Sequence, residues 1–184
     1  MMVVRRRAFV GAAPALIAGA ALALPFAARG QAVCAAPTPS DVEGPFYKAG
    51  APARASFVEA GSKAEKLVLT GVVRSADCKP LAKVTLDFWQ AGANGDYDNR
   101  GYRYRGVVTS DAQGRYRLET SLPPPYMGRP RHLHVKLQRP GGRVLTTQLY
   151  FPGESRNENP ALVVKMERGE GARLAAYDFV LGEI

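Results

Sequence analysis

The only two histidines of the chain, His132 and His134, stand two residues apart. In a β-strand, residues two apart point to the same face, so both imidazoles share one face with Lys136 while Leu133 and Val135 lie on the other. Two neutral imidazoles on one face can converge on a metal ion, because imidazole is the commonest nitrogen ligand in proteins. The same spacing also suits two histidines with a purely structural role, so other residues must decide between the two interpretations.

The segment that leads into these histidines carries further polar groups. It runs from Tyr126 to His134 with the sequence Tyr-Met-Gly-Arg-Pro-Arg-His-Leu-His, directly after three prolines. Proline and glycine favour turns over regular structure, so this stretch is expected to deliver a phenol, guanidinium groups and two imidazoles from a turn into a strand. The apolar face of that strand requires a core, and the histidine face requires a polar surrounding.

Strand-like runs alternate with turn signals along the rest of the chain, about every 8 to 12 residues. We expect strands at 67–73, 84–89, 106–109, 114–120, 132–137, 144–151 and 175–181. The runs 106–109 and 114–120 flank Asp-Ala-Gln-Gly, which predicts a hairpin. Prolines and a glycine in 37–47 predict an extended arm, and 92–101 predicts a loop. The pattern indicates an all-β fold, a β-sandwich (immunoglobulin-like or transthyretin-like) of short, mostly antiparallel strands.

Residues 1–32 have the composition of an export signal, which leaves 33–184 as one catalytic β-sandwich domain. Arg5, Arg6 and Arg7 precede an Ala- and Gly-rich apolar run that ends in small residues. The order Arg-Arg-Ala-Phe-Val resembles a twin-arginine signal, which predicts a periplasmic or secreted protein. An uncleaved membrane anchor is the alternative, since the run approaches the length that spans a bilayer. Alanine and glycine are retained poorly in membranes, which favours cleavage and no stable span after processing.

The charge balance argues against nucleic acid as a partner. The full chain has 25 basic and 16 acidic residues, a net charge of +9. Without residues 1–32, which contain four arginines and no acid, 21 basic residues face 16 acidic ones and the net charge is +5. That mild excess contains no run of lysines and arginines, so it indicates a solvated basic surface.

The two cysteines, Cys34 and Cys78, both lie beyond the expected cleavage point. In an oxidising compartment they can form a disulfide between the N-terminal tail and a loop, and the alternative is two free thiols. They cannot make a zinc site by themselves, because they do not form a closely spaced pair.

An ordered set of residues across 37–153 resembles the intradiol ring-cleavage dioxygenases, the family of protocatechuate and catechol dioxygenases. Each piece is weak alone, but the order is specific. The pieces are Trp89-Gln90-Ala91 with Gly95 and Tyr97; Asp111 with Gly114, Tyr116 and Thr120; Pro124 and Tyr126; Arg129-Pro130 with His132 and His134; and Thr147-Gln148-Leu149-Tyr150-Phe151.

The resemblance implies a mononuclear Fe(3+) ion held by two tyrosines and two histidines. By family position these are Tyr97, Tyr126, His132 and His134. Tyr126 would be the axial ligand that leaves when substrate binds, with His134 as the other axial ligand. The chemistry agrees, because two phenolates and two imidazoles suit a hard trivalent ion whose charge removes the phenol protons. Tyr102 and Tyr104 compete locally with Tyr97 for this role.

The resemblance also carries over catalytic and substrate-binding residues. Arg129 would stabilise negative charge that develops on the aromatic ring, and Gln148 would form a hydrogen bond near the site. A salt bridge is the structural alternative for Arg129, and plain strand packing is the alternative for Gln148. Gly44 and Pro45 resemble an arm that lines the substrate pocket.

The chain departs from the well-known members in two ways. Six positions separate Tyr126 from His132, fewer than in the aromatic-degrading enzymes. The resemblance therefore does not determine the part of the pocket wall that recognises the substrate. The long helical N-terminal region of the catechol dioxygenases is also missing, although a homo-oligomer remains compatible with the sequence.

The sequence therefore predicts an exported iron(III) enzyme of aromatic compound catabolism. It would cleave an ortho-dihydroxylated ring with dioxygen, between the two hydroxylated carbons, to a cis,cis-muconate-type diacid. The alternatives are a non-catalytic module that binds zinc or copper through His132 and His134, and a transthyretin-like binding domain without chemistry. Tyr97 and Tyr126 distinguish the enzyme from these alternatives, since a non-catalytic module needs no phenolate ligands.

Overall fold

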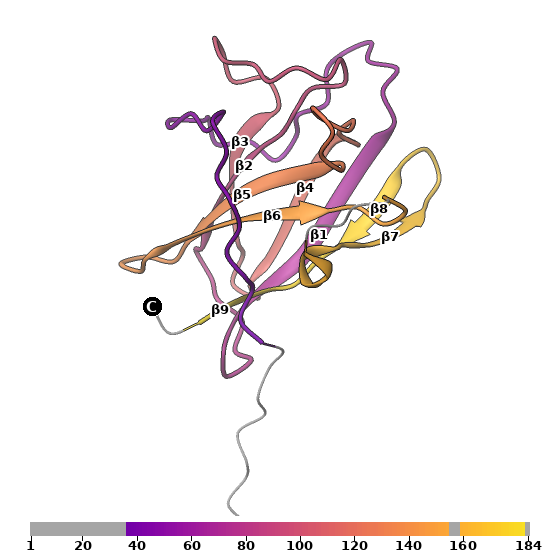
Figure 1. Ribbon diagram of the computed structural model, residues 1–184. Helices are drawn as coiled ribbons and strands as arrows, with labels where there is room; N and C mark the ends of the chain where they lie inside the picture. The colour runs from indigo at the N-terminus through magenta and orange to yellow at the C-terminus, as the bar shows by residue number, and fades with distance from the viewer. Residues whose placement is uncertain (1–35, 155–158, 183–184) are drawn as a thin grey trace, which may run out of the picture. The chain divides into compact units, whose positions relative to one another are not determined.

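The computed structural model describes residues 36–154 and 159–182, and these fold as strands joined by turns and loops (Figure 1). Within them no helix is long and apolar enough to cross a membrane. The elements are β1 (Lys66–Ser75), β2 (Thr85–Trp89), β3 (Arg105–Thr109), β4 (Arg115–Ser121), β5 (His132–Gln138), β6 (Val144–Tyr150), the 3₁₀ turn η1 (Pro160–Leu162), β7 (Lys165–Arg168), β8 (Arg173–Ala176) and β9 (Phe179–Leu181).

These strands form two sheets that share one core. One sheet has the order β4-β1-β8-β7, with β9 also paired to β1, and the other has the order β3-β2-β5-β6. Among these pairings β1–β8 and β1–β9 are parallel and the rest are antiparallel. Both sheets contribute side chains to the core, among them Leu67, Leu69, Leu118, Phe88, Leu133, Val135 and Leu137. The predicted β-sandwich is confirmed.

The predicted hairpin between 106–109 and 114–120 is wrong. The turn itself forms, since the Gly114 amide donates to the Asp111 carbonyl at 2.9 Å. The strands on either side of it belong to different sheets, because β3 pairs with β2 while β4 pairs with β1 along its length. The Val73 amide in β1 donates to the Gly114 carbonyl at 2.8 Å, which holds the far end of the turn on the other sheet. A turn signal predicts a reversal of the chain, and it does not specify the partner of each strand.

The single strand predicted at 175–181 is two strands, β8 and β9, and β7 was not predicted. β8 and β9 both run parallel to β1, on either side of Tyr177 and Asp178. At this break the Asp178 carboxylate accepts from the Val72 amide at 2.8 Å, in place of a backbone carbonyl. The strand is therefore interrupted where a side chain replaces one rung of the backbone ladder.

Irregular segments cover several sheet edges. The Pro52 carbonyl accepts from Val107 in β3 at 2.9 Å, and the Ala55 carbonyl accepts from Glu119 in β4 at 2.8 Å. The predicted extended arm 37–47 is confirmed and lies on the other side, where the Asp41 amide donates to Thr146 of β6 at 3.0 Å. Figure 1 shows this arm, in indigo, running across β6 and β5. The arm therefore covers the outer face of the sheet that carries the histidines.

Replacing Gly71 with alanine is expected to destabilise the fold at the break between β8 and β9. A Cβ atom at Gly71 would overlap the carbonyl oxygen of Tyr177 and lie 2.9 Å from the Tyr116 ring. Because backbone cannot yield as a flexible side chain does, we expect the free energy of unfolding to fall by about 2 to 4 kcal/mol in urea denaturation. Gly182→Ala is the matched control, since its nearest contact is an ordinary 3.7 Å to Pro37. Equal stability of the two variants would contradict the close packing of Gly71 against the Tyr177 backbone.

The predicted export signal (1–32) and Cys34 lie outside the described residues. Cys78, the other cysteine of the sequence, is disulfide-bonded. It lies in the turn that follows β1, where its amide donates to the Ser75 carbonyl at 3.0 Å.

Candidate metal centre

The two histidines project from β5 toward the covered outer face of their sheet. Both are buried, with exposed fractions of 3% for His132 and 2% for His134. Nδ1 of His132 lies 2.7 Å from the carbonyl oxygen of Pro130. Because a carbonyl only accepts, Nδ1 carries the proton, and Nε2 carries the lone pair with which this ring can bind a metal ion. Burial lowers the pKa of His134 well below its usual value, so this ring is neutral, as a metal ligand must be.

A phenol oxygen lies within 3.1 Å of Nε2 of both imidazoles. The Tyr97 hydroxyl is 3.1 Å from Nε2 of His132 and 3.1 Å from Nε2 of His134. Burial raises the pKa of the Tyr97 phenol above its usual value, so in a site without a cation this group is neutral. A bound cation would reverse that preference and stabilise the phenolate. The arrangement brings three potential ligand atoms together from two distant parts of the chain.

The other two tyrosines near Tyr97 in sequence have different partners. The Tyr102 hydroxyl donates to the Ala49 carbonyl at 2.9 Å. The Tyr104 hydroxyl lies 3.3 Å from a carboxylate oxygen of Glu59. Of these three tyrosines, the geometry therefore selects Tyr97 as the candidate ligand.

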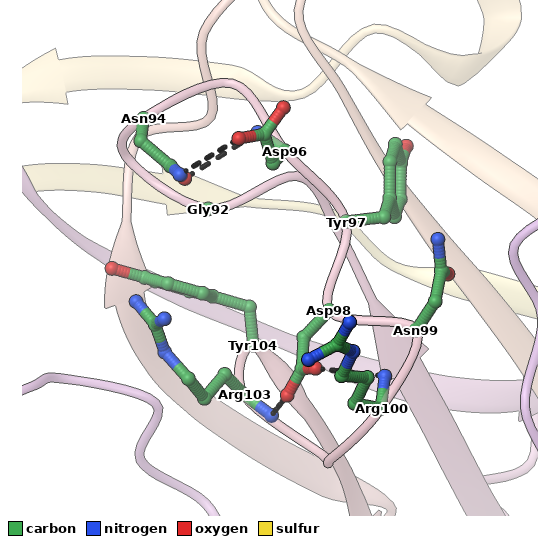
Figure 2. A pocket seen from close by; sticks show the side chains of 9 residues that line it. All are labelled: Gly92, Asn94, Asp96, Tyr97, Asp98, Asn99, Arg100, Arg103 and Tyr104. Atoms are coloured by element: carbon green, nitrogen blue, oxygen red, sulfur yellow. Dashed lines mark hydrogen bonds between the residues drawn. The ribbon is translucent and has the colours of Figure 1, made fainter.

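The loop that presents Tyr97 is held by its own polar groups (Figure 2). The Asp98 carboxylate accepts from the amides of Arg100, Gly101 and Arg103 at 3.0, 2.8 and 2.9 Å. These hydrogen bonds lower the pKa of Asp98 to about 2. A pocket of about 350 Å³ lies in this loop and is lined by Gly92, Asn94, Asp96, Tyr97, Asp98, Asn99, Arg100, Arg103 and Tyr104. A loop fixed in this way can hold Tyr97 in position before a metal ion binds.

The second predicted tyrosine ligand, Tyr126, lies beside the first. The ring centroids of Tyr126 and Tyr97 are 5.2 Å apart in an edge-on arrangement. Tyr126 begins a tight turn in which the Arg129 amide donates to its carbonyl at 2.8 Å. Unlike Tyr97, it is half-buried. The structure therefore brings all four predicted ligands together and leaves Tyr126 the most accessible of them.

These residues fit a hard trivalent ion. Among the described residues there is no group of three or more His, Cys, Asp or Glu side chains that could hold a metal ion. A metal ion bound through both histidines would therefore draw its remaining protein ligands from the tyrosines. Two imidazoles and two phenolates suit ferric iron better than copper(I) or a thiolate-type zinc site.

The predicted arginine and glutamine contact each other beside this cluster. Nη2 of Arg129 donates to Oε1 of Gln148 at 3.1 Å. Gln148 stands opposite His134 in the β5–β6 register and is fully buried. This contact holds the Arg129 guanidinium beside the strand pair that carries His134. A guanidinium held in this way is suited to developing negative charge.

The arm residues Gly44 and Pro45 were predicted to line the pocket. An added Cβ at Gly44 would lie 3.5 Å from Cε1 of His134, so the backbone of the arm passes beside this ring. Pro45 follows on the same arm and is exposed.

Several neighbours of the cluster had no assigned role in the sequence. Trp89 stacks on His134, with ring centroids 4.8 Å apart and planes at 9°. Phe46 stacks on Tyr97 at 4.4 Å and meets the edge of Tyr126 at 5.5 Å. Arg105 is 1% exposed and its Nε donates to the Asp98 carbonyl at 3.0 Å, next to Tyr97. The Trp89–His134 contact follows from strand pairing, but the Phe46 contacts depend on the path of the arm, which no local pattern specifies.

Comparison with known proteins agrees with this cluster. The dioxygenase family profile matches residues 42–181, most of the chain. Chlorocatechol 1,2-dioxygenase from Pseudomonas sp. (strain P51) is 31% identical, over 76% of this chain and 68% of the relative. The chain belongs to the intradiol ring-cleavage dioxygenase family. Another relative is the catechol 1,2-dioxygenase of Acinetobacter baylyi, which is 31% identical over 64% of this chain. The match covers 47% of that relative, about half of its length.

Solved structures of family members share the fold. The dioxygenase domain of a dioxygenase carbohydrate-binding protein fusion from Streptomyces sp. SirexAA-E superposes with a TM-score of 0.78 at 44% identity, over 81% of this chain and 100% of that chain. Chlorocatechol 1,2-dioxygenase from Pseudomonas putida gives a TM-score of 0.70 at 29% identity, over 79% of this chain and 72% of that chain.

Proposed function

We propose that this protein is a non-haem iron(III) intradiol dioxygenase. Its substrate would be an ortho-dihydroxylated aromatic ring, cleaved between the two hydroxylated carbons to a cis,cis-muconate-type diacid. The observation that carries the proposal is the Tyr97 hydroxyl, which lies 3.1 Å from Nε2 of both histidines within a chain of this family. Both atoms of dioxygen end in the diacid, one on each former ring carbon, so the reaction needs no further reductant.

Tyr97, Tyr126, His132 and His134 would hold the ferric ion. When bound, iron supplies chelation of the two substrate oxygens and activation of the ring toward dioxygen. Tyr126 would also take up a proton from the substrate, which its half-exposed place at a turn favours. Arg129 would stabilise negative charge on the ring, and Gln148 would orient Arg129.

The substrate class follows from the relatives. Relatives of this chain include dioxygenases of catechol, chlorocatechol and 6-chlorohydroxyquinol. All three have two adjacent hydroxyl groups on a benzene ring, and we propose the same class for this protein. Dioxygen would be the second substrate.

Oxygen uptake with catechol tests this function. The iron-loaded protein is expected to consume one dioxygen for each catechol, and both atoms of labelled dioxygen are expected in the diacid. A protein that holds iron but takes up no oxygen with any ortho-dihydroxybenzene would contradict the proposal, as would label in only one carboxyl group.

Replacing Tyr126 with phenylalanine tests the proton acceptor. Without its hydroxyl this residue can neither bind the metal nor take up the substrate proton, and general base catalysis typically contributes about 10²- to 10⁴-fold. We expect kcat to fall by at least about 10²-fold in steady-state kinetics with catechol. Tyr116→Phe is the control, since its hydroxyl donates to the Tyr177 carbonyl at 2.9 Å, away from the cluster. Full turnover in Tyr126→Phe would remove Tyr126 from the mechanism.

We further propose that the protein is exported through a twin-arginine signal at residues 1–32. The sequence Arg-Arg-Ala-Phe-Val and the disulfide-bonded Cys78 support an oxidising compartment. N-terminal sequencing of protein recovered outside the cytoplasm would test it. A mature N-terminus near residue 33 is expected, and an intact residue 1 on cytoplasmic protein would contradict it.

A further inference from the structure

A chain of hydrogen bonds joins the N-terminal arm to the arginine beside the metal cluster. It begins at Asp41, whose two carboxylate oxygens have different partners. Oδ1 accepts from the Val42 amide at 2.6 Å, which fixes the side chain against its own backbone. Oδ2 accepts from the Tyr150 hydroxyl at 2.9 Å. The arm is thereby tied to the end of β6 through a residue 109 positions away.

The direction of the Tyr150 hydroxyl follows from its neighbours. The Tyr150 hydroxyl lies 2.9 Å from Oδ2 of Asp41 and 3.4 Å from Oε1 of Gln148. The contact with the carboxylate is shorter and charge-assisted, so the proton lies there. The oxygen lone pairs then face Nη2 of Arg129, which donates to this hydroxyl at 3.1 Å. Asp41 therefore orients the group that accepts from Arg129.

The arm orients Gln148 in the same way. Nε2 of Gln148 donates to the Val42 carbonyl at 2.6 Å. With its nitrogen held by the arm, the amide must present Oε1 to Nη2 of Arg129, at 3.1 Å. Two consecutive arm residues thus orient two acceptors of Nη2 of Arg129, the Tyr150 hydroxyl and the Gln148 amide oxygen.

We propose that Asp41 and Tyr150 are positioning residues for Arg129, and that docking of the arm and placement of this arginine are one coupled event. The inference rests on the proposed function for the part Arg129 plays in ring cleavage. Its geometric part, the coupling, is independent of that reaction. Tyr150 is fully buried and Asp41 half-buried, so water replaces these contacts poorly. Coupling is reciprocal, so loss of Arg129 must also loosen the arm.

The kinetic test compares Asp41→Asn, Tyr150→Phe and the double variant, each loaded with iron. A hydrogen bond to a charged group is worth about tenfold or more, so each single variant is expected to lower kcat about tenfold, with a smaller change in KM. Both residues act through Arg129, so their effects should not multiply. The fold-loss of kcat in the double variant should be at least threefold smaller than the product of the two single fold-losses. A double variant whose fold-loss of kcat equals the product of the two single losses would overturn the proposal. Single variants whose kcat stays within twofold of the wild type would also overturn it.

Glu43→Gln is the matched control, because Glu43 lies on the same arm and pairs with Lys136 at 2.6 Å instead of with this network. Iron content and the tyrosinate charge-transfer band should be unchanged in every variant, since neither Asp41 nor Tyr150 is a proposed ligand. A loss of iron or of the band in Tyr150→Phe would assign that residue to the metal site and overturn a purely positioning role.

Amide hydrogen exchange of the arm tests the coupling without turnover. In Arg129→Gln the peptide that contains Asp41 and Val42 should exchange at least threefold faster than in the wild type, while peptides of β1 stay unchanged. An arm that exchanges as in the wild type would overturn the coupling. If the wild type fails to cleave any ortho-dihydroxybenzene, the proposed function falls, while the exchange experiment still decides whether Arg129 and the arm are coupled.

Discussion

Tyr97→Phe is expected to abolish stable iron binding and with it the activity. The Tyr97 hydroxyl is the oxygen that lies 3.1 Å from both imidazole nitrogens. Phenylalanine keeps the ring that stacks on Phe46, so packing is preserved while the ligand atom is lost. Mutation of a residue that only supports a metal ligand already lowers metal affinity by about 10- to 100-fold. Loss of a ligand itself should therefore lower iron affinity by more than about 100-fold. Iron titration followed by dialysis measures this loss.

The control for Tyr97→Phe is Tyr102→Phe. Tyr102 lies on the same loop, and its hydroxyl donates to the Ala49 carbonyl at 2.9 Å. We expect this variant to retain iron and turnover. Iron that stays bound at full stoichiometry in Tyr97→Phe, with the visible colour unchanged, would contradict the assignment of Tyr97 as a ligand.

Arg129→Gln is expected to retain iron but to lower kcat by about 10²- to 10³-fold, the usual effect of removing a group that stabilises developing charge. Arg129 donates to the Gln148 side chain and to the Tyr150 hydroxyl, both at 3.1 Å. These two contacts fix a positively charged group beside the cluster, where negative charge on the ring would develop. Arg129→Lys should also be impaired, because an ammonium cannot reproduce the planar geometry of the guanidinium.

The control for Arg129→Gln is Arg143→Gln, which removes the same charge from an exposed turn between β5 and β6. Single-turnover kinetics of iron-loaded protein would separate binding from chemistry. Unchanged kcat in Arg129→Gln with iron retained would leave Arg129 a structural role only.

The local pattern around the histidines was sufficient to predict their placement. Alternation predicted that His132 and His134 share a face opposite Leu133 and Val135, and the structure confirms it, with both imidazoles on the covered face and both leucine and valine in the core. The assignment of Tyr97 over Tyr102 and Tyr104 came from family spacing alone. The structure supplies the physical reason, which is that the other two hydroxyls have partners elsewhere.

Residues that are distant in sequence account for what was missed. The hairpin at 106–120 failed because β3 and β4 each pair with a strand of a different sheet, and such pairing depends on the whole fold. The bond between Tyr150 and Asp41 joins positions 109 apart, and neither residue lies in a local pattern that indicates it. Periodicity predicts which way a side chain faces, and it does not predict which segment will cover that face.

The visible absorption spectrum of the iron-loaded mature protein, recorded with and without catechol in the absence of oxygen, tests the central claim most directly. Ligation by Tyr97 and Tyr126 predicts a broad tyrosinate-to-iron charge-transfer band that shifts when catechol chelates the metal and Tyr126 leaves. A colourless protein that instead holds stoichiometric zinc or copper would contradict the dioxygenase assignment.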